Sequence, residues 1–243
     1  LQPNERTALE GKDIVIIDMG NTQTTALLIS LPEDSLDSKK VPLFGSGGPF
    51  VKSSCYEANL GAAHFDKLIF KHFADICEKK HQTTVSLNSR RGKRLINGCE
   101  RVRKLLSQLP EASITVENLT DNGDVNFKLT RDELLTLGSD LLSSFRNMLV
   151  NNLLSGMSAS DIANIGGVEI LGGGSRMTVV QTVICEIFRD NKNINNVTGP
   201  GTTATSTINA HKALGAKLDD GSIALGAALI ANNQLVDTKL AIS

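Results

Sequence analysis

The sequence predicts an α/β fold with a smaller α+β domain inserted into it. Short β-branched runs and helical patterns occur near both ends of the chain, whereas the middle consists of two helical patterns followed by a hairpin pattern. The composition agrees with such a fold, because 40% of the 243 residues are hydrophobic and 21% are charged. Disordered, collagen-like and coiled-coil proteins are therefore excluded.

Two strands joined by a turn are expected at the N-terminal end of the larger domain. Residues 13–18 form a β-branched run, and residues 23–30 form a second one after a polar turn at 19–21. Residues 31–49 are rich in Pro, Gly, Ser and acidic residues, which predicts a surface excursion. A strand-like segment follows at residues 50–60.

The inserted part is expected to contain two helices and a hairpin. Apolar residues spaced by three and four predict an amphipathic helix over 62–81 and a second helix over about 87–109, which a proline ends. Alternating stretches at 112–119 and 124–129 are joined through Asn122-Gly123, a strong hairpin signal. This order of elements differs from the strand and helix alternation on either side.

The C-terminal part returns to alternating strands and helices. A capping-box pattern predicts a long helix over 130–154, and a short buried strand follows at 168–171. After a helix at 177–188, a loop rich in Gly, Thr and Asn spans about 190–210, and a last small-residue helix is expected at 222–231.

Charge and residue counts exclude several classes of function. Because 25 basic residues face 26 acidic ones and aromatics make up only 4%, neither nucleic acid nor an anionic membrane is an expected partner. No apolar run approaches the ~20 residues that cross a bilayer, and the polar N-terminus is unlike a signal peptide. The four cysteines and four histidines lack the spacing of a metal site, and no nucleophile with its base can be singled out.

Two glycine-containing turns are candidates for binding phosphate. In the first, Asp18 ends a strand and Gly20 opens the turn, so backbone N–H groups could approach phosphate while the carboxylate holds water around Mg²⁺. In the second, Gly172, Gly173 and Gly174 lead from a strand to Ser175 and Arg176. A solvated hairpin turn and a plain strand-to-helix turn are the alternatives. The second turn lacks the GxGxxG spacing and the P-loop lysine.

A third candidate is a polar helix face that could hold a purine. Glu100, Arg103, Lys104 and Ser107 are spaced by three, four and seven, which places them on one face away from the buried stripe. Their aliphatic stems and hydrogen-bonding groups suit a base and a ribose. Two alternatives stay open: a solvated basic face, or a face over residues 90–104 that binds an acidic partner. A nucleic-acid patch is disfavoured because no aromatics interleave with the charges.

Four motifs in order resemble those of one known family. LGAAHFDKLIFKHF from Leu60, CERVRKLLS from Cys99, ILGGGSRM from Ile170 and DDGSIALGAA from Asp219 are similar to motifs of the 70-kDa heat shock protein superfamily of actin-like ATPases. The resemblance implies a ribonuclease H-like fold, and specifically the second lobe of the nucleotide-binding domain. The first lobe, with its own phosphate loop and catalytic residues, has no counterpart here.

The resemblance also implies a division of the chain. Residues 11–60 together with 139–243 would form the base subdomain, and residues 61–138 would be the inserted upper one. This agrees with the inserted domain that periodicity predicts. Residues 1–10 are expected to be disordered or a linker.

The same resemblance assigns roles to the candidate residues. ATP or ADP with Mg²⁺ is the implied ligand of the intact parent, whereas the isolated chain is expected to hold none. Asp18 would be the carboxylate on the Mg²⁺ side, and no residue would be a metal ligand. The implied phosphate-loop residues are Gly20, Asn21, Thr22 and Gln23. The implied nucleoside residues are Glu100, Arg103, Lys104, Ser107, Gly172, Gly173, Gly174, Arg176 and Asp220.

The phosphate loop departs from the family pattern. Hydrolysing members carry a DLGGGTFD-like run, whereas this chain has DMGNTQTT, in which side chains replace two glycines. Such erosion resembles the 110-kDa and 170-kDa relatives, which are nucleotide exchange factors and holdases for 70-kDa partners and unfolded clients. The expected location is the cytoplasm, or alternatively the endoplasmic reticulum lumen. The alternative function is a hydrolysis-competent chaperone. The chain alone is expected to lack enzyme activity, since hydrolysis needs both lobes.

Overall fold

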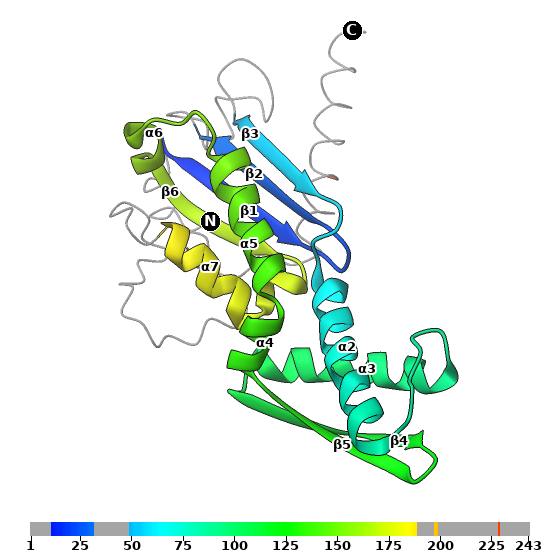
Figure 1. Ribbon diagram of the computed structural model, residues 1–243. Coiled ribbons are helices and arrows are strands. Elements are labelled where there is room, and N and C mark those ends of the chain that lie inside the picture. Colours follow the sequence, from blue (N-terminus) through cyan, green and yellow to red (C-terminus); the bar gives the residue numbers. More distant parts are fainter. Residues whose placement is uncertain (1–10, 32–48, 189–196, 199–227, 229–243) are drawn as a thin grey trace, which may run out of the picture.

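The computed structural model describes residues 11–31, 49–188 and 197–198, together with position 228, and contains two sheets (Figure 1). The larger sheet has the order β3-β2-β1-β6-β7, in which β1 runs antiparallel to β2 and parallel to β6. Its strands are β1 (Asp13–Met19), β2 (Thr24–Ser30), β3 (Phe50–Glu57), β6 (Ile165–Leu171) and β7 (Val197–Thr198).

Helices pack on one face of this sheet. Figure 1 shows α5 (Ser139–Asn147) and α7 (Thr178–Phe188) lying side by side across it. A π-helix, η1 (Met148–Leu153), continues α5 and contacts β2 and β3. The central strand β1 is buried at most positions, as expected of a strand between two neighbours in a covered sheet. The core of this unit lies between β1, β2 and the α5–η1 helix.

The second unit consists of α2 (Ala62–His81), α3 (Arg90–Leu106) and a two-stranded sheet of β4 (Glu111–Thr120) and β5 (Gly123–Thr130). In Figure 1 the long helix α2 leads from the end of β3 down to this unit. Phe73 of α2 stacks on Phe127 of β5 with ring centroids 4.4 Å apart. Phe73 and Phe127 are both buried, so the helices and the hairpin share one core.

The predicted helix over 130–154 is confirmed in extent, since helical residues run from Arg131 to Leu153, but it is interrupted at Gly138. The break leaves α4 (Arg131–Leu137) separate from α5 and η1. A Cβ atom at Gly138 would lie 2.8 Å from the ring of Phe65 in α2, so the glycine allows the two units to approach. The predicted capping box is confirmed, since the Thr130 side chain accepts from the Glu133 N–H and the Glu133 side chain accepts from the Thr130 N–H.

Smaller corrections concern the ends of elements. α3 begins at Arg90, after the N-cap residue Ser89, and ends at Leu106, so it is shorter than the predicted 87–109. A short helix, α6 (Ala159–Ala163), was not predicted, although Ser158 and Asp161 form a capping box there. β6 begins at Ile165 rather than at 168, because its pairing with β1 starts there. The two glycines that follow Ile165 disfavour a strand on their own, and the register of the pairing shifts at the first of them.

Some expectations fall on residues that the structure does not describe. These are the N-terminal residues 1–10, the interior of the excursion at 32–48, the closing helix at 222–231 apart from position 228, and Asp220. Among the described helices, none combines the length and the apolar character that a membrane span requires.

Candidate functional site

The turn between β1 and β2 lies at the carboxyl end of β1. The Gly20 N–H donates to the Gln23 carbonyl at 2.9 Å, which closes a tight turn. Asn21, Thr22 and Gln23 are exposed, and the Tyr56 hydroxyl donates to the Gln23 side-chain oxygen at 3.1 Å. The turn therefore presents the Asn21 and Thr22 side chains at the two positions where the DLGGGTFD-like pattern has glycines.

The start of α2 is fastened to this turn. Gly20 and Asn21 accept hydrogen bonds through their carbonyl groups from the N–H groups of Ala62 and Ala63, at 3.1 and 2.8 Å. A Cβ atom at Gly61 would lie 2.6 Å from the Asn21 carbonyl oxygen, so only glycine permits this approach. These first-turn N–H groups of α2 thus hold the turn in place instead of facing a ligand.

The glycine run packs directly against the end of β1. Asp18 lies opposite Leu171 in the parallel pairing of β1 with β6, so Gly172 follows beside it. Gly172 has a positive φ of 80°, and a Cβ atom there would lie 2.4 Å from the Met19 carbonyl oxygen and 2.5 Å from Asp18 Oδ1. A side chain at Gly172 is therefore excluded by both conformation and space.

The other two glycines of the run differ from each other. A Cβ atom at Gly174 would lie 2.6 Å from the Met19 side chain, whereas Gly173 faces open space. Gly173 is thus the one glycine of the three whose missing side chain leaves room for a ligand. Arg176, in the single turn η2 (Gly174–Arg176), is exposed.

Arg103 of α3 is buried, so the prediction that it lies on an accessible polar face together with the other candidate residues of α3 is wrong. It is 5% exposed, and its Nε and Nη2 atoms donate to the two carboxylate oxygens of Asp66 in α2 at 2.7 and 3.2 Å. Burial raises the pKa of the Asp66 carboxyl, and the hydrogen bonds and charge of Arg103 partly offset that rise. Arg103 therefore joins α2 to α3.

The remaining residues of this face of α3 are accessible. Glu100 and Lys104 form an exposed ion pair at 2.7 Å, which lowers the pKa of Glu100. Ser107 is half-buried at the C-terminal end of α3, where its hydroxyl donates to the Arg103 carbonyl at 3.2 Å. Glu100, Lys104 and Ser107 thus keep polar atoms at the surface.

The end of α3 meets the segment that follows the glycine run. The Thr178 hydroxyl donates to the Ser107 carbonyl at 3.3 Å. Arg103, Ser107, Met177 and Thr178 also line one shallow depression, which encloses no space for a water molecule. Two segments about seventy residues apart in the chain are therefore in direct contact, and a ligand can lie across their junction but not between them.

A more spacious hollow of about 210 Å³ lies between the turn and α3. Asn21 contributes from the turn, Asp66 from α2 and Glu100 from α3, so three elements converge on it. Of the cavity residues on α2 and α3, the sequence patterns singled out Glu100 alone. Asp66 and the others could not be found in this way, because only the crossing of the two helices places them together. The remaining lining residues are Ala63, Lys67, Leu87, Ile96 and Asn97.

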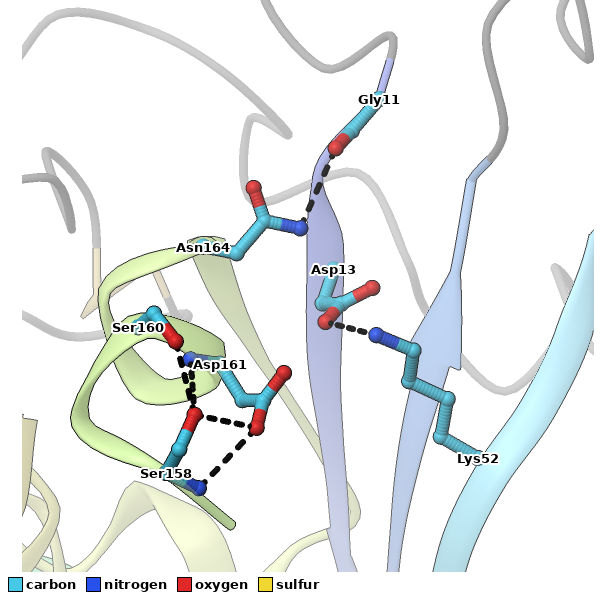
Figure 2. Close-up of polar contacts among 7 residues, drawn as sticks. All are labelled: Gly11, Asp13, Lys52, Ser158, Ser160, Asp161 and Asn164. Carbon is cyan, nitrogen blue, oxygen red and sulfur yellow. Dashed lines mark hydrogen bonds and ion pairs between the residues drawn. The ribbon is translucent and has the colours of Figure 1, made fainter.

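A second polar cluster lies at the opposite end of β1 (Figure 2). Asp13 is fully buried, and Lys52 donates to its Oδ2 atom at 2.7 Å. Lys52 is the extra residue where the pairing of β2 with β3 shifts, and this bulge directs the ammonium group to Asp13. Figure 2 shows Asn164 joining Gly11 beside this pair. Because this cluster is at the amino end of β1, it is separate from the cavity at the carboxyl end.

No group of three or more potential metal-ligating side chains occurs within the ranges that the structure describes. The described residues predicted to bind nucleotide lie on the β1–β2 turn, on α3 and on the glycine run. The structure brings the turn close to α3, and α3 close to the segment after the glycine run. Asn21 shares a cavity with Glu100, and Ser107 touches the segment after Gly174. Asp220 lies outside the described residues.

Comparison with known proteins gives a consistent family assignment. A family model described as Hsp70 protein matches residues 8–206. Heat shock 70 kDa protein 16 of Arabidopsis thaliana is 30% identical over 176 residues, which are 72% of this chain and 21% of that protein.

Other relatives carry the names of further heat shock proteins. A heat shock protein homolog of Saccharomyces cerevisiae is 26% identical over 94% of this chain and 27% of its own length. Heat shock protein 110 of Caenorhabditis elegans is 26% identical over 74% of this chain and 21% of its own length. The chain thus spans about a fifth to a quarter of these relatives. With its mixed sheet and the actin-like ATPase fold that the match implies, this chain belongs to the Hsp70 protein family.

Proposed function

We propose that the chain is the second lobe of the adenine-nucleotide-binding domain of a longer chaperone, most similar to the 110-kDa members of its family. The observation that carries the proposal is the cavity that Asn21 of the β1–β2 turn shares with Glu100 of α3. In the division we propose, residues 11–60 and 139–243 form the base and residues 61–138 the inserted subdomain. The step from β3 into α2 at Gly61 and the break at Gly138 support these limits.

The residues present fit the nucleoside part of the ligand. Glu100, Lys104 and Ser107 offer hydrogen-bonding groups at the surface, and Gly173 has open space where a side chain would lie. Arg176 is exposed and can stack on a base or reach a phosphate. Arg103 is assigned a positioning role, because its guanidinium group already binds Asp66. Asp220 stays a proposed member of this set.

The fit to the phosphates is poorer. Asn21, Thr22 and Gln23 place exposed side chains on the turn, and the first N–H groups of α2 already bind turn carbonyls. Asp18 is half-buried beside the turn and would orient water on the Mg²⁺ side. Bound ATP with Mg²⁺ would supply the phosphoryl group for hydrolysis. These features support a parent protein that binds nucleotide but hydrolyses it weakly.

The proposed role of the parent protein follows from the poor fit of this loop to the phosphates of ATP. A protein that keeps the nucleotide-binding fold and loses fast hydrolysis suits a nucleotide exchange factor or holdase, with 70-kDa chaperones and unfolded proteins as partners. The similarity to heat shock protein 110 of Caenorhabditis elegans supports that branch. The cytoplasm, or alternatively the endoplasmic reticulum lumen, is the proposed location. A parent with ordinary ATPase activity is the alternative, and single-turnover hydrolysis by the longer protein distinguishes the two.

The test compares ADP binding by variants of the longer protein. Glu100→Ala removes a hydrogen-bonding carboxylate from the proposed site and is expected to weaken ADP binding about tenfold. Lys93→Ala removes a charge from the same helix outside the cavity and should leave ADP binding unchanged. Equal affinities of Glu100→Ala and the parent for ADP would contradict the assignment.

The isolated chain is expected to hydrolyse no ATP above the buffer rate. One lobe alone cannot hold the attacking water in line with the γ-phosphate, because the opposite lobe of the nucleotide-binding domain supplies the other contacts. Steady phosphate release by the chain, abolished in Asp18→Ala, would show that this lobe is itself an enzyme.

A further inference from the structure

A second hollow lies between α3 and β4, next to the first cavity, and Asn97 lines both. Its volume is about 330 Å³, so it is larger than the cavity assigned to the nucleotide. One wall is a stripe of α3 with the spacing of a single helical face, formed by Arg94, Asn97, Gly98 and Arg101. The other wall is the run of residues 114–117 of β4. We call this hollow the α3–β4 groove.

The helix and the strand touch at the base of the groove. A Cβ atom at Gly98 would lie 2.6 Å from the Ile114 side chain and 3.2 Å from the Val116 side chain. The absence of a side chain at Gly98 therefore brings the two elements into contact, while the longer side chains on either side of it stand at the rim. The surface that a ligand would meet is mainly polar, which suits the backbone and polar side chains of a peptide.

The strand wall is an open edge in the described part of the chain, where β4 pairs with β5 alone. Successive side chains of a strand point to opposite faces, so a wall of four consecutive residues follows the backbone rather than one face. Near the bulge after Val116, Arg94 Nη1 donates to the carbonyls of Glu117 and Asn118 at 3.3 and 3.4 Å. Before the bulge, only the N–H and C=O groups that point away from β5 could pair with an added strand.

The rim of the groove is positively charged. Two arginines, Arg94 and Arg101, face one acidic residue, Glu117. Arg101 is exposed and forms no ion pair with any residue that the structure describes. The nearest acidic residue along the helix, Glu100, is paired with Lys104. A ligand with several negative charges would complement this rim.

We propose that the α3–β4 groove binds an extended acidic peptide segment, which adds to β4 as a strand and places carboxylates against Arg94 and Arg101. Seven helical residues separate these arginines by about 10 Å along the axis, and an extended peptide covers that length in about three residues. Carboxylates on one face of a strand lie about 7 Å apart at a spacing of two residues and about 13 Å apart at a spacing of four, so the long arginine side chains must make up the difference from about 10 Å. The proposed peptide contacts use Arg94, Arg101 and β4, none of which lines the cavity assigned to the nucleotide.

The test uses a fluorescent octapeptide of alternating glutamate and valine and measures anisotropy with the 243-residue chain at low salt. Arg101→Gln is expected to weaken binding about tenfold, since it removes a charge-assisted hydrogen bond at the rim. Lys93→Gln removes the same charge from an exposed position of α3 outside the groove and should change binding less than about twofold. Unchanged melting temperatures of both variants establish that they are folded.

A second probe separates strand addition from simple attraction between charges. The same peptide with every backbone amide N-methylated keeps its carboxylates but cannot donate a backbone hydrogen bond to β4, so it should bind at least about tenfold more weakly. Absence of binding at low salt, equal loss in Arg101→Gln and Lys93→Gln, or full binding of the N-methylated peptide would each overturn the proposal. Tighter binding of a short single-stranded oligonucleotide would overturn it as well.

Discussion

Gly172 illustrates how a single residue fixes the geometry of the candidate site. Its positive φ and its approach to Met19 and Asp18 allow β6 to end directly against β1. The sequence pattern had suggested that all three glycines leave space for a ligand. Instead, neighbouring protein atoms occupy the space where a side chain would lie at Gly172 and at Gly174. Of the three glycines, Gly173 alone faces open space. Spacing within a sequence cannot distinguish these uses, because both require the absence of a side chain.

Replacing Gly172 with alanine should destabilise the chain by about 2 kcal/mol or more. The substitution introduces a Cβ atom at a positive φ and presses it against backbone that cannot move easily. Gly173→Ala is the matched control, because open space surrounds that position and the change should stay within about 1 kcal/mol. Urea unfolding of the two variants measures the difference. Equal stabilities would mean that the Met19 contact is not tight.

At the scale of elements, the Asp66–Arg103 pair holds α2 against α3. Both side chains are less than one tenth exposed, so each charge depends on the other. Helical periodicity placed Arg103 on a polar face, because a buried arginine and a solvated one have the same spacing. Asp66 could not be recognised in the sequence as the partner of Arg103, because the two residues are 37 positions apart.

Asp66→Ala is expected to destabilise the chain by about 3–5 kcal/mol, because it leaves the Arg103 guanidinium buried without its partner. The double variant Asp66→Leu, Arg103→Met removes both charges and should recover a large part of that loss. Glu100→Ala serves as the control, since the exposed Glu100–Lys104 pair contributes at most about 1 kcal/mol. If Asp66→Ala were as mild as Glu100→Ala in urea unfolding, the buried pair would not be what joins the two helices.

The pattern of elements was easier to predict than their limits. Hairpin turns at Asn122-Gly123 and near Gly20 are confirmed, because turn chemistry is local. The break at Gly138 was not predicted, since the apolar pattern continues through it and only the packing of Phe65 from α2 requires a small residue there. Local signals therefore identify elements, whereas contacts between units decide where a helix stops.

At the scale of the whole molecule, two units meet around the carboxyl ends of β1 and β6. The first turn of α2 is hydrogen-bonded to the β1–β2 turn, and the C-terminal end of α3 contacts the start of α7. The inserted arrangement could be inferred from the order of elements along the chain. The sharing of one cavity by Asn21 and Glu100 could not, because it depends on how α2 and α3 cross.

Titrating ADP into the isotope-labelled chain, with NMR shifts recorded at each backbone amide, tests most directly whether these elements form one nucleotide site. NMR detects the weak binding expected of one lobe. Concerted shifts with one common affinity are predicted at the amides of Asn21, Glu100, Ser107 and Gly173, while that of Lys93 stays still. Shifts confined to one of the three elements, or none at high ADP concentration, would contradict a shared site.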